Sequence, residues 1–134
     1  MANINSPTTN LSRFVDHHLQ PLTEKLPSYV KDMGAFLRRI EANNKVNPNA
    51  ILVTMDVSAL FTSIPHREGI NAAAHYLETR ENPTIITRVI LKFLTLILFL
   101  NNFSFNDEHY LQCKGFAMGA KCSGSYVDLF MGLF

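Results

Sequence analysis

A short apolar run that ends in an aspartate most constrains the fold of this chain. Residues 51–55 read Ile-Leu-Val-Thr-Met, a composition typical of a buried strand, and Asp56 follows directly. A carboxylate at the end of a buried strand can hold a metal ion over a cleft, and the Val57 carbonyl could add a second oxygen ligand. Because an isolated aspartate in this position more often caps the following turn, the pattern is not specific by itself. We predict a central strand here, with Asp56 as a candidate metal ligand.

Helical spacing of apolar residues predicts helices on both sides of this strand. The first is expected to end or kink at Pro21, and the second to be capped by Ser28. In the long helix before residue 100, the second half is apolar all round and should be buried on every side. The expected helices cover residues 11–22, 29–43, 65–80, 83–100 and 123–134. Asn106 and Asp107 stand between two short apolar segments and predict a β-hairpin.

Length and composition favour one small α+β domain that is rich in helix. The chain has 134 residues, of which 47% are hydrophobic, enough for a core without disulfide bonds. Residues 1–10 are expected to form a flexible tail, followed by a helical part over 11–47 and a second part over 48–134. The absence of a secretory pattern predicts an intracellular protein, in the nucleus or cytoplasm and not secreted.

Net charge and hydropathy give no support to nucleic-acid binding or to a membrane span. With 12 Lys and Arg residues against 11 Asp and Glu residues, the net charge of +1 does not by itself indicate a nucleic-acid binder. The apolar stretch over 85–100 is interrupted by Arg88 and Lys92, and a membrane span needs about 20 apolar residues. We therefore expect a buried helix there and no membrane association.

Two further patterns accompany Asp56. Phe61 follows it five residues later, although a phenylalanine in such a place is usually part of the core. Residues 112–123 form a loop in which Gly115 and Gly119 would let the backbone approach a ligand closely, ahead of a helix N-terminus. Lys121 is placed to contact a phosphate. Each pattern is weak evidence alone. Their occurrence together in one chain strengthens the case for a functional role of each.

Together these residues resemble the reverse transcriptases of Penelope-like retroelements. The resemblance extends from about Leu11 to Met131 and rests on four stretches in the same order. They are residues 14–22, residues 27–37, Met55-Asp56-Val57-Ser58-Ala59-Leu60-Phe61-Thr62-Ser63-Ile64-Pro65-His66, and residues 110–131 with Gly115, Ala117-Met118-Gly119 and Lys121. The fold it implies is part of the fingers and palm of a polymerase. The whole segment 11–134 would then be a truncated reverse transcriptase domain.

The resemblance also implies roles for individual residues. Asp56 would be the first metal-binding aspartate, binding Mg²⁺ with Val57, and Phe61 would exclude a ribose hydroxyl in place of the family's more usual tyrosine. The loop containing Gly115, Met118, Gly119 and Lys121 would contact nucleotide and template. The partners of the intact enzyme would be an RNA template, a DNA primer and dNTPs, joined by two-metal phosphoryl transfer.

The sequence departs from this family in ways that leave an alternative open. Gly124 stands where proline is usual, and Met33-Gly34 replace an Asp-Thr pattern. The family's next motif, a hairpin with two adjacent aspartates, is not found, so the chain alone is expected to be inactive and to expose apolar surface that favours self-association. The alternative is a non-catalytic remnant that acts at most as a nucleic-acid or protein interaction module.

Overall fold

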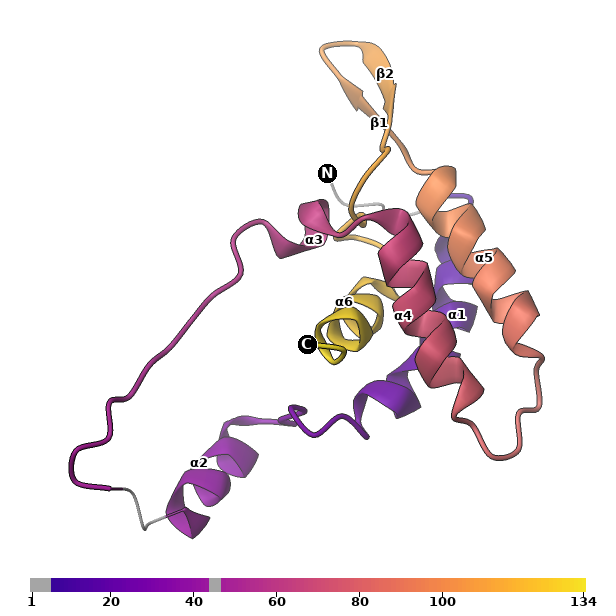
Figure 1. Ribbon diagram of the computed structural model, residues 1–134. Helices are drawn as coiled ribbons and strands as arrows, with labels where there is room; N and C mark the ends of the chain where they lie inside the picture. The colour runs from indigo at the N-terminus through magenta and orange to yellow at the C-terminus, as the bar shows by residue number, and fades with distance from the viewer. Residues whose placement is uncertain (1–5, 44–46) are drawn as a thin grey trace.

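The computed structural model describes residues 6–43 and 47–134, and within them the fold is helix-rich with one antiparallel hairpin (Figure 1). In chain order the elements are α1 (Thr9–Thr23), α2 (Met33–Ala42), α3 (Leu60–Ser63), α4 (His66–Glu78), α5 (Thr87–Phe99), β1 (Asn102–Phe105), β2 (Glu108–Leu111) and α6 (Ser123–Met131). This is the general α+β class that the sequence predicts.

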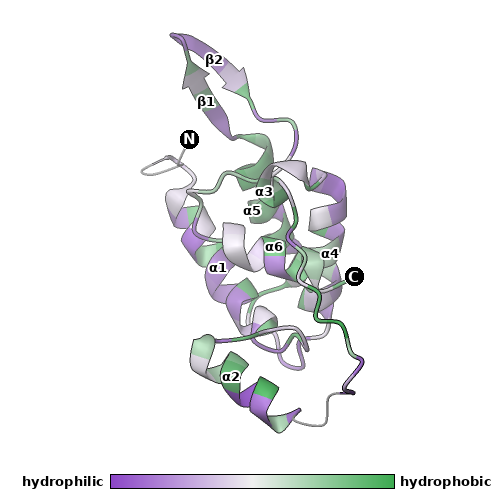
Figure 2. Ribbon diagram, turned by 90° about the vertical axis from the view of Figure 1, so that its left-hand side faces the viewer, coloured by the Kyte–Doolittle hydropathy of each residue, from purple (hydrophilic) through white to green (hydrophobic). Residues whose placement is uncertain are grey.

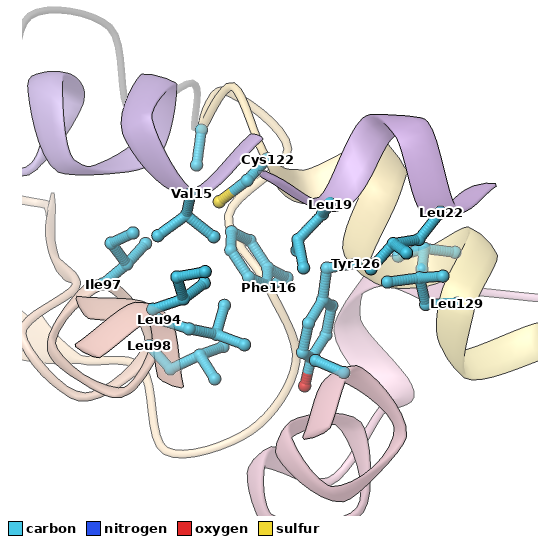
Figure 3. Packing of buried hydrophobic residues seen from close by; sticks show 14 of the residues in the cluster. Val15, Leu19, Leu22, Leu94, Ile97, Leu98, Phe116, Cys122, Tyr126 and Leu129 are labelled. Atoms are coloured by element: carbon cyan, nitrogen blue, oxygen red, sulfur yellow. The ribbon is translucent and has the colours of Figure 1, made fainter. Parts of the chain in front are cut away.

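Helices α1, α4, α5 and α6 pack around one core, while α2 and the hairpin project from it (Figure 1). Tyr126 of α6 lies in the middle of this core, fully buried (Figure 3). Gly69 of α4 makes room for it, because a Cβ at that position would meet the phenol ring and its oxygen. The labelled core residues in Figure 3 are Val15, Leu19, Leu22, Leu94, Ile97, Leu98, Phe116, Cys122, Tyr126 and Leu129.

A pair of buried hydrogen bonds joins α1 to the start of α6. The Cys122 N–H donates to Ser12 Oγ at 3.0 Å, and the Ser12 hydroxyl donates to Cys122 Sγ at 3.3 Å. Nearby, the Ser125 hydroxyl donates to Asp16 Oδ1 at 2.7 Å. These polar contacts fix the register of two helices whose other contacts are apolar and less directional.

Helix α1 differs from its predicted limits at both ends. It begins at Thr9, inside the expected flexible tail, of which residues 1–5 lie outside the described residues. It also continues through Pro21 to Thr23. Because Leu19 and Leu22 are both buried against the core, packing offsets the hydrogen bond that proline removes from the last turn.

Helix α2 is shorter than predicted, and its apolar stripe has no cover. Asp32, not Ser28, caps it, since its Oδ1 accepts from the Ala35 N–H at 2.7 Å. The helix buries no residue. The exposed apolar side chains of its stripe are Met33, Phe36, Leu37 and Ile40.

The predicted strand over 51–55 is wrong. Residues 50–57 form no strand and run as an exposed, irregular segment, in which Leu52 is 93% exposed. Figure 2 shows it as a strongly apolar connection that leads to α3 outside the helical core. A strand needs a second backbone to pair with, and the described parts of the chain contain only the mutually paired β1 and β2.

The helix predicted over residues 83–100 is present as α5, but its predicted limits are wrong. It begins at Thr87, not at residue 83. Leu94, Ile97 and Leu98 are buried, but Phe99 is half exposed, so the second half is not covered on every side. None of the helices in the described ranges is long and apolar enough to cross a membrane.

The hairpin is confirmed. Asn106 and Asp107 both take positive φ values, 50° and 61°, as a tight two-residue turn requires. Phe103 pairs with Tyr110 across the strands, and their rings stack with centroids 5.4 Å apart. Local turn chemistry thus forms this element even though both strands are exposed to solvent.

Candidate functional site

The segment after Asp56 folds into a tight turn that presents Phe61. Ala59 adopts a left-handed conformation with φ 51°, and the Thr62 hydroxyl donates to the Ala59 carbonyl at 3.0 Å. The short helix α3 follows from Leu60. Phe61 lies half buried and packs against the core, so its ring is held by the body of the protein.

The glycine loop docks on this turn through its backbone. The Gly115 N–H donates to the Ile64 carbonyl at 2.9 Å, and the Phe116 N–H donates to the Phe61 carbonyl at 2.6 Å. Phe116 itself is buried. The structure therefore brings together Phe61 and Gly115, two of the predicted site residues that are distant in sequence.

Only glycine fits at position 115. Its φ is +77°, a left-handed value, and a Cβ there would lie 2.5 Å from Thr62 Cα. The neighbouring atoms are backbone and cannot swing away. The close backbone approach that Gly115 allows is therefore to the Thr62 backbone of the chain itself.

His66 completes the junction and was not predicted. It is buried at the start of α4, and its Nε2–H donates to the Gly115 carbonyl at 2.8 Å, across 49 residues of sequence. Because a carbonyl only accepts, Nε2 carries the proton. Buried Nδ1 has no hydrogen-bond partner among the described residues. The sequence predicts a surface or partly packed histidine here, and the position directly after Pro65, at a helix start, does not indicate the contact with Gly115.

Two other candidate residues of the loop face solvent. Met118 is 66% exposed, Lys121 is exposed and Gly119 is half buried. The Ser123 hydroxyl donates to the Met118 carbonyl at 3.5 Å, a long contact. Met118 and Lys121 are therefore free to contact a ligand, while Gly115 is fixed to the turn beneath them.

Asp56 and Val57 lie in the exposed segment before the turn. Asp56 is exposed to solvent and its carboxylate has no hydrogen-bond or ion-pair partner in the described part of the chain. Val57 lines an apolar groove of about 290 Å³ together with Ile64, Phe130 and Phe134. The predicted setting of Asp56, at the end of a buried strand, is not formed.

The residues present do not fit a magnesium site. A hard cation needs several oxygen ligands, and Asp56 with the Val57 carbonyl supplies one carboxylate and one neutral oxygen. Within residues 6–43 and 47–134, no group of three or more His, Cys, Asp or Glu side chains is placed to hold a metal ion.

Comparison with protein families, curated proteins and solved structures gives no further relation. No family profile matches the chain, and neither the curated proteins nor the solved structures contain a significant match.

Proposed function

We propose that the chain is the nucleotide-facing part of a reverse transcriptase domain of the Penelope-like type. The intact enzyme would add dNTPs to a DNA primer on an RNA template. The observation that supports this most is the docking of the glycine loop on the Phe61 turn through Gly115 and Phe116. A polymerase of this kind needs those two segments beside the same nucleotide, and the sequence separates them by about fifty residues.

In this proposal the loop and turn have separate tasks. Phe61, packed against the core, would present a rigid ring to the sugar of the incoming nucleotide. Lys121 would contact a phosphate, and Met118 would lie against a base or sugar. Asp56 would supply one metal-binding carboxylate once further ligands are present.

A second candidate is a non-catalytic remnant that acts as an interaction module. Two observations favour it: the single carboxylate at the site, and the apolar side chains exposed along residues 51–55. A remnant would keep the packed core but have no selectivity for deoxynucleotides.

Photoaffinity labelling with a dNTP that carries a photoreactive base separates the two candidates. The reverse transcriptase proposal predicts labelling of the peptide that contains Gly115 and Lys121, with competition by dNTPs and weaker competition by rNTPs. Phe61→Ala should remove that preference, whereas Phe36→Ala, on the exposed face of α2, should not. Labelling spread over the surface, or equal competition by dNTPs and rNTPs, would favour the remnant.

Primer extension tests whether the chain has polymerase activity that depends on Asp56. We expect no extension by the 134-residue chain with dNTPs and either Mg²⁺ or Mn²⁺, because the family's two adjacent aspartates are not found in these residues and losing members of a catalytic unit costs orders of magnitude in rate. Extension that persists in Asp56→Asn would contradict the assignment of this residue.

A further inference from the structure

A second hollow lies at the other end of α4 from the glycine loop. It has a volume of about 390 Å³ and is formed by the C-terminal half of α1 and the connection between α4 and α5. Its polar lining residues are His17, His18, Lys25, Arg80, Glu81, Asn82 and Thr84. Because α4 has 13 residues, about 20 Å of helix separates this hollow from His66 and Gly115. We call it the α1–α4 basic cleft.

Basic groups outnumber acidic ones in this cleft. Lys25 and Arg80 carry two positive charges against one carboxylate, Glu81, and two histidines line the same cleft. The Lys25 ammonium has no partner within the described residues, and Glu81 forms no ion pair there. The cleft therefore carries net positive charge that the protein itself does not neutralise.

Arg80 is held in place by the protein and still has donors to offer. Its Nε–H donates to the Leu77 carbonyl at 2.9 Å, and Nη2 donates to the Ile85 carbonyl at 3.1 Å and to Thr87 Oγ1 at 3.0 Å. Nη1 has no partner in the described ranges, so two N–H groups remain. A guanidinium fixed in this way loses little side-chain entropy when it binds an anion.

The C-terminus of α4 lies directly before Arg80 in the chain. A helix C-terminus carries partial negative charge on its free carbonyl groups. Here the Leu77 carbonyl accepts from Arg80 Nε and from the Thr87 hydroxyl. One of the terminal carbonyls nearest to Arg80 is therefore already satisfied.

His18 lies in the same cleft, and its pKa responds to burial and to the neighbouring charges. Burial lowers the pKa of His18, and the charges of His17 and Arg80 lower it further. Lys25 and Glu81 line the same hollow, and the Phe14 ring packs edge-on against His18. A bound anion would counteract the charge of Arg80 and so raise the pKa of His18.

We propose that the α1–α4 basic cleft binds a phosphate group, either as a free anion or as part of a nucleic-acid backbone. Arg80 Nη1 and Lys25 are the donors, and Thr84 and Asn82 complete a polar rim. Charge-assisted hydrogen bonds from a fixed guanidinium are among the stronger contacts to phosphate. This site is separate from the proposed nucleotide-facing loop, so either proposal can fail without the other.

Pyrophosphate titration of the whole chain tests this site. We expect saturable binding with a Kd below about 1 mM, and a rise in the pKa of His18, followed by NMR, when pyrophosphate is present. Lys25→Gln should weaken binding about fivefold, the effect of one charge at contact distance in water. Lys92→Gln, an equal change of charge on the exposed side of α5, should leave binding unchanged.

The outcomes distinguish the source of the phosphate. If a single-stranded oligodeoxynucleotide binds more tightly than pyrophosphate and is weakened by Lys25→Gln, the site takes a nucleic-acid backbone. If pyrophosphate binds as tightly as the oligonucleotide, it takes a free anion. Equal weakening by Lys25→Gln and Lys92→Gln, or no rise in the His18 pKa, overturns the proposal. Lys25 is used because Arg80 also holds the α4–α5 connection, and its replacement could unfold it.

Discussion

Replacing Gly115 with alanine tests the junction between the glycine loop and the Phe61 turn. If the loop stays in place, the left-handed backbone costs about 1–2 kcal/mol and the new Cβ meets Thr62 Cα at 2.5 Å. If the loop moves away, three hydrogen bonds are lost, from Gly115 N–H, Phe116 N–H and His66 Nε2–H, at about 1 kcal/mol each. The second outcome costs less than the steric overlap, and the loss of its three hydrogen bonds lowers the free energy of unfolding by about 3 kcal/mol.

Urea denaturation followed by far-UV circular dichroism measures this loss. Gly124→Ala is the matched control, because a Cβ at Gly124 meets no atom within 4 Å and the residue lies in α6. It should stabilise the protein by about 0.5–1 kcal/mol. A Gly115→Ala protein within 0.5 kcal/mol of the wild type would refute the contribution that we assign to this junction.

Three further predictions concern the core, the thiols and the exposed apolar segment. Tyr126→Phe should raise the free energy of unfolding by about 1 kcal/mol in the urea assay, since the buried hydroxyl has no partner among the described residues; a loss of stability would contradict this. Burial raises the pKa of Cys122 to about 12. At pH 8 a thiol reagent should therefore modify only the exposed Cys113 until urea is added. Equal modification rates for the two thiols would contradict this. The chain should self-associate at tens of micromolar in sedimentation experiments, and Leu52→Lys with Met55→Lys should reduce this; a monomeric wild type would rule it out.

Elements that depend on neighbouring residues could be predicted from the sequence. The hairpin follows from Asn106 and Asp107, whose side chains tolerate positive φ, and α4 follows from Pro65 at its start. For α2, the sequence predicts Ser28 as the N-cap, whereas the observed N-cap is Asp32. Both are good caps, and the sequence pattern does not rank them.

Features that depend on distant partners could not be predicted. The composition of residues 51–55 favours a strand, but a strand forms only beside another, and the described chain offers none to this segment. The contact of His66 with Gly115 likewise has no local signature, because its two members are set by how α4 and the loop meet. For the candidate site, the structure brings the glycine loop and the Phe61 turn together, while the strand expected before Asp56 is not formed.

The hydrogen bonds between Ser12 and Cys122 bear on the order of folding during synthesis. These residues are 110 positions apart, so α1 leaves the ribosome long before its partner exists. The hairpin and the α4–α5 pair, whose contacts are local, can form as soon as they emerge. Until α6 follows, the apolar face of α1 has no complete partner, and the nascent chain presents it to chaperones or to other chains.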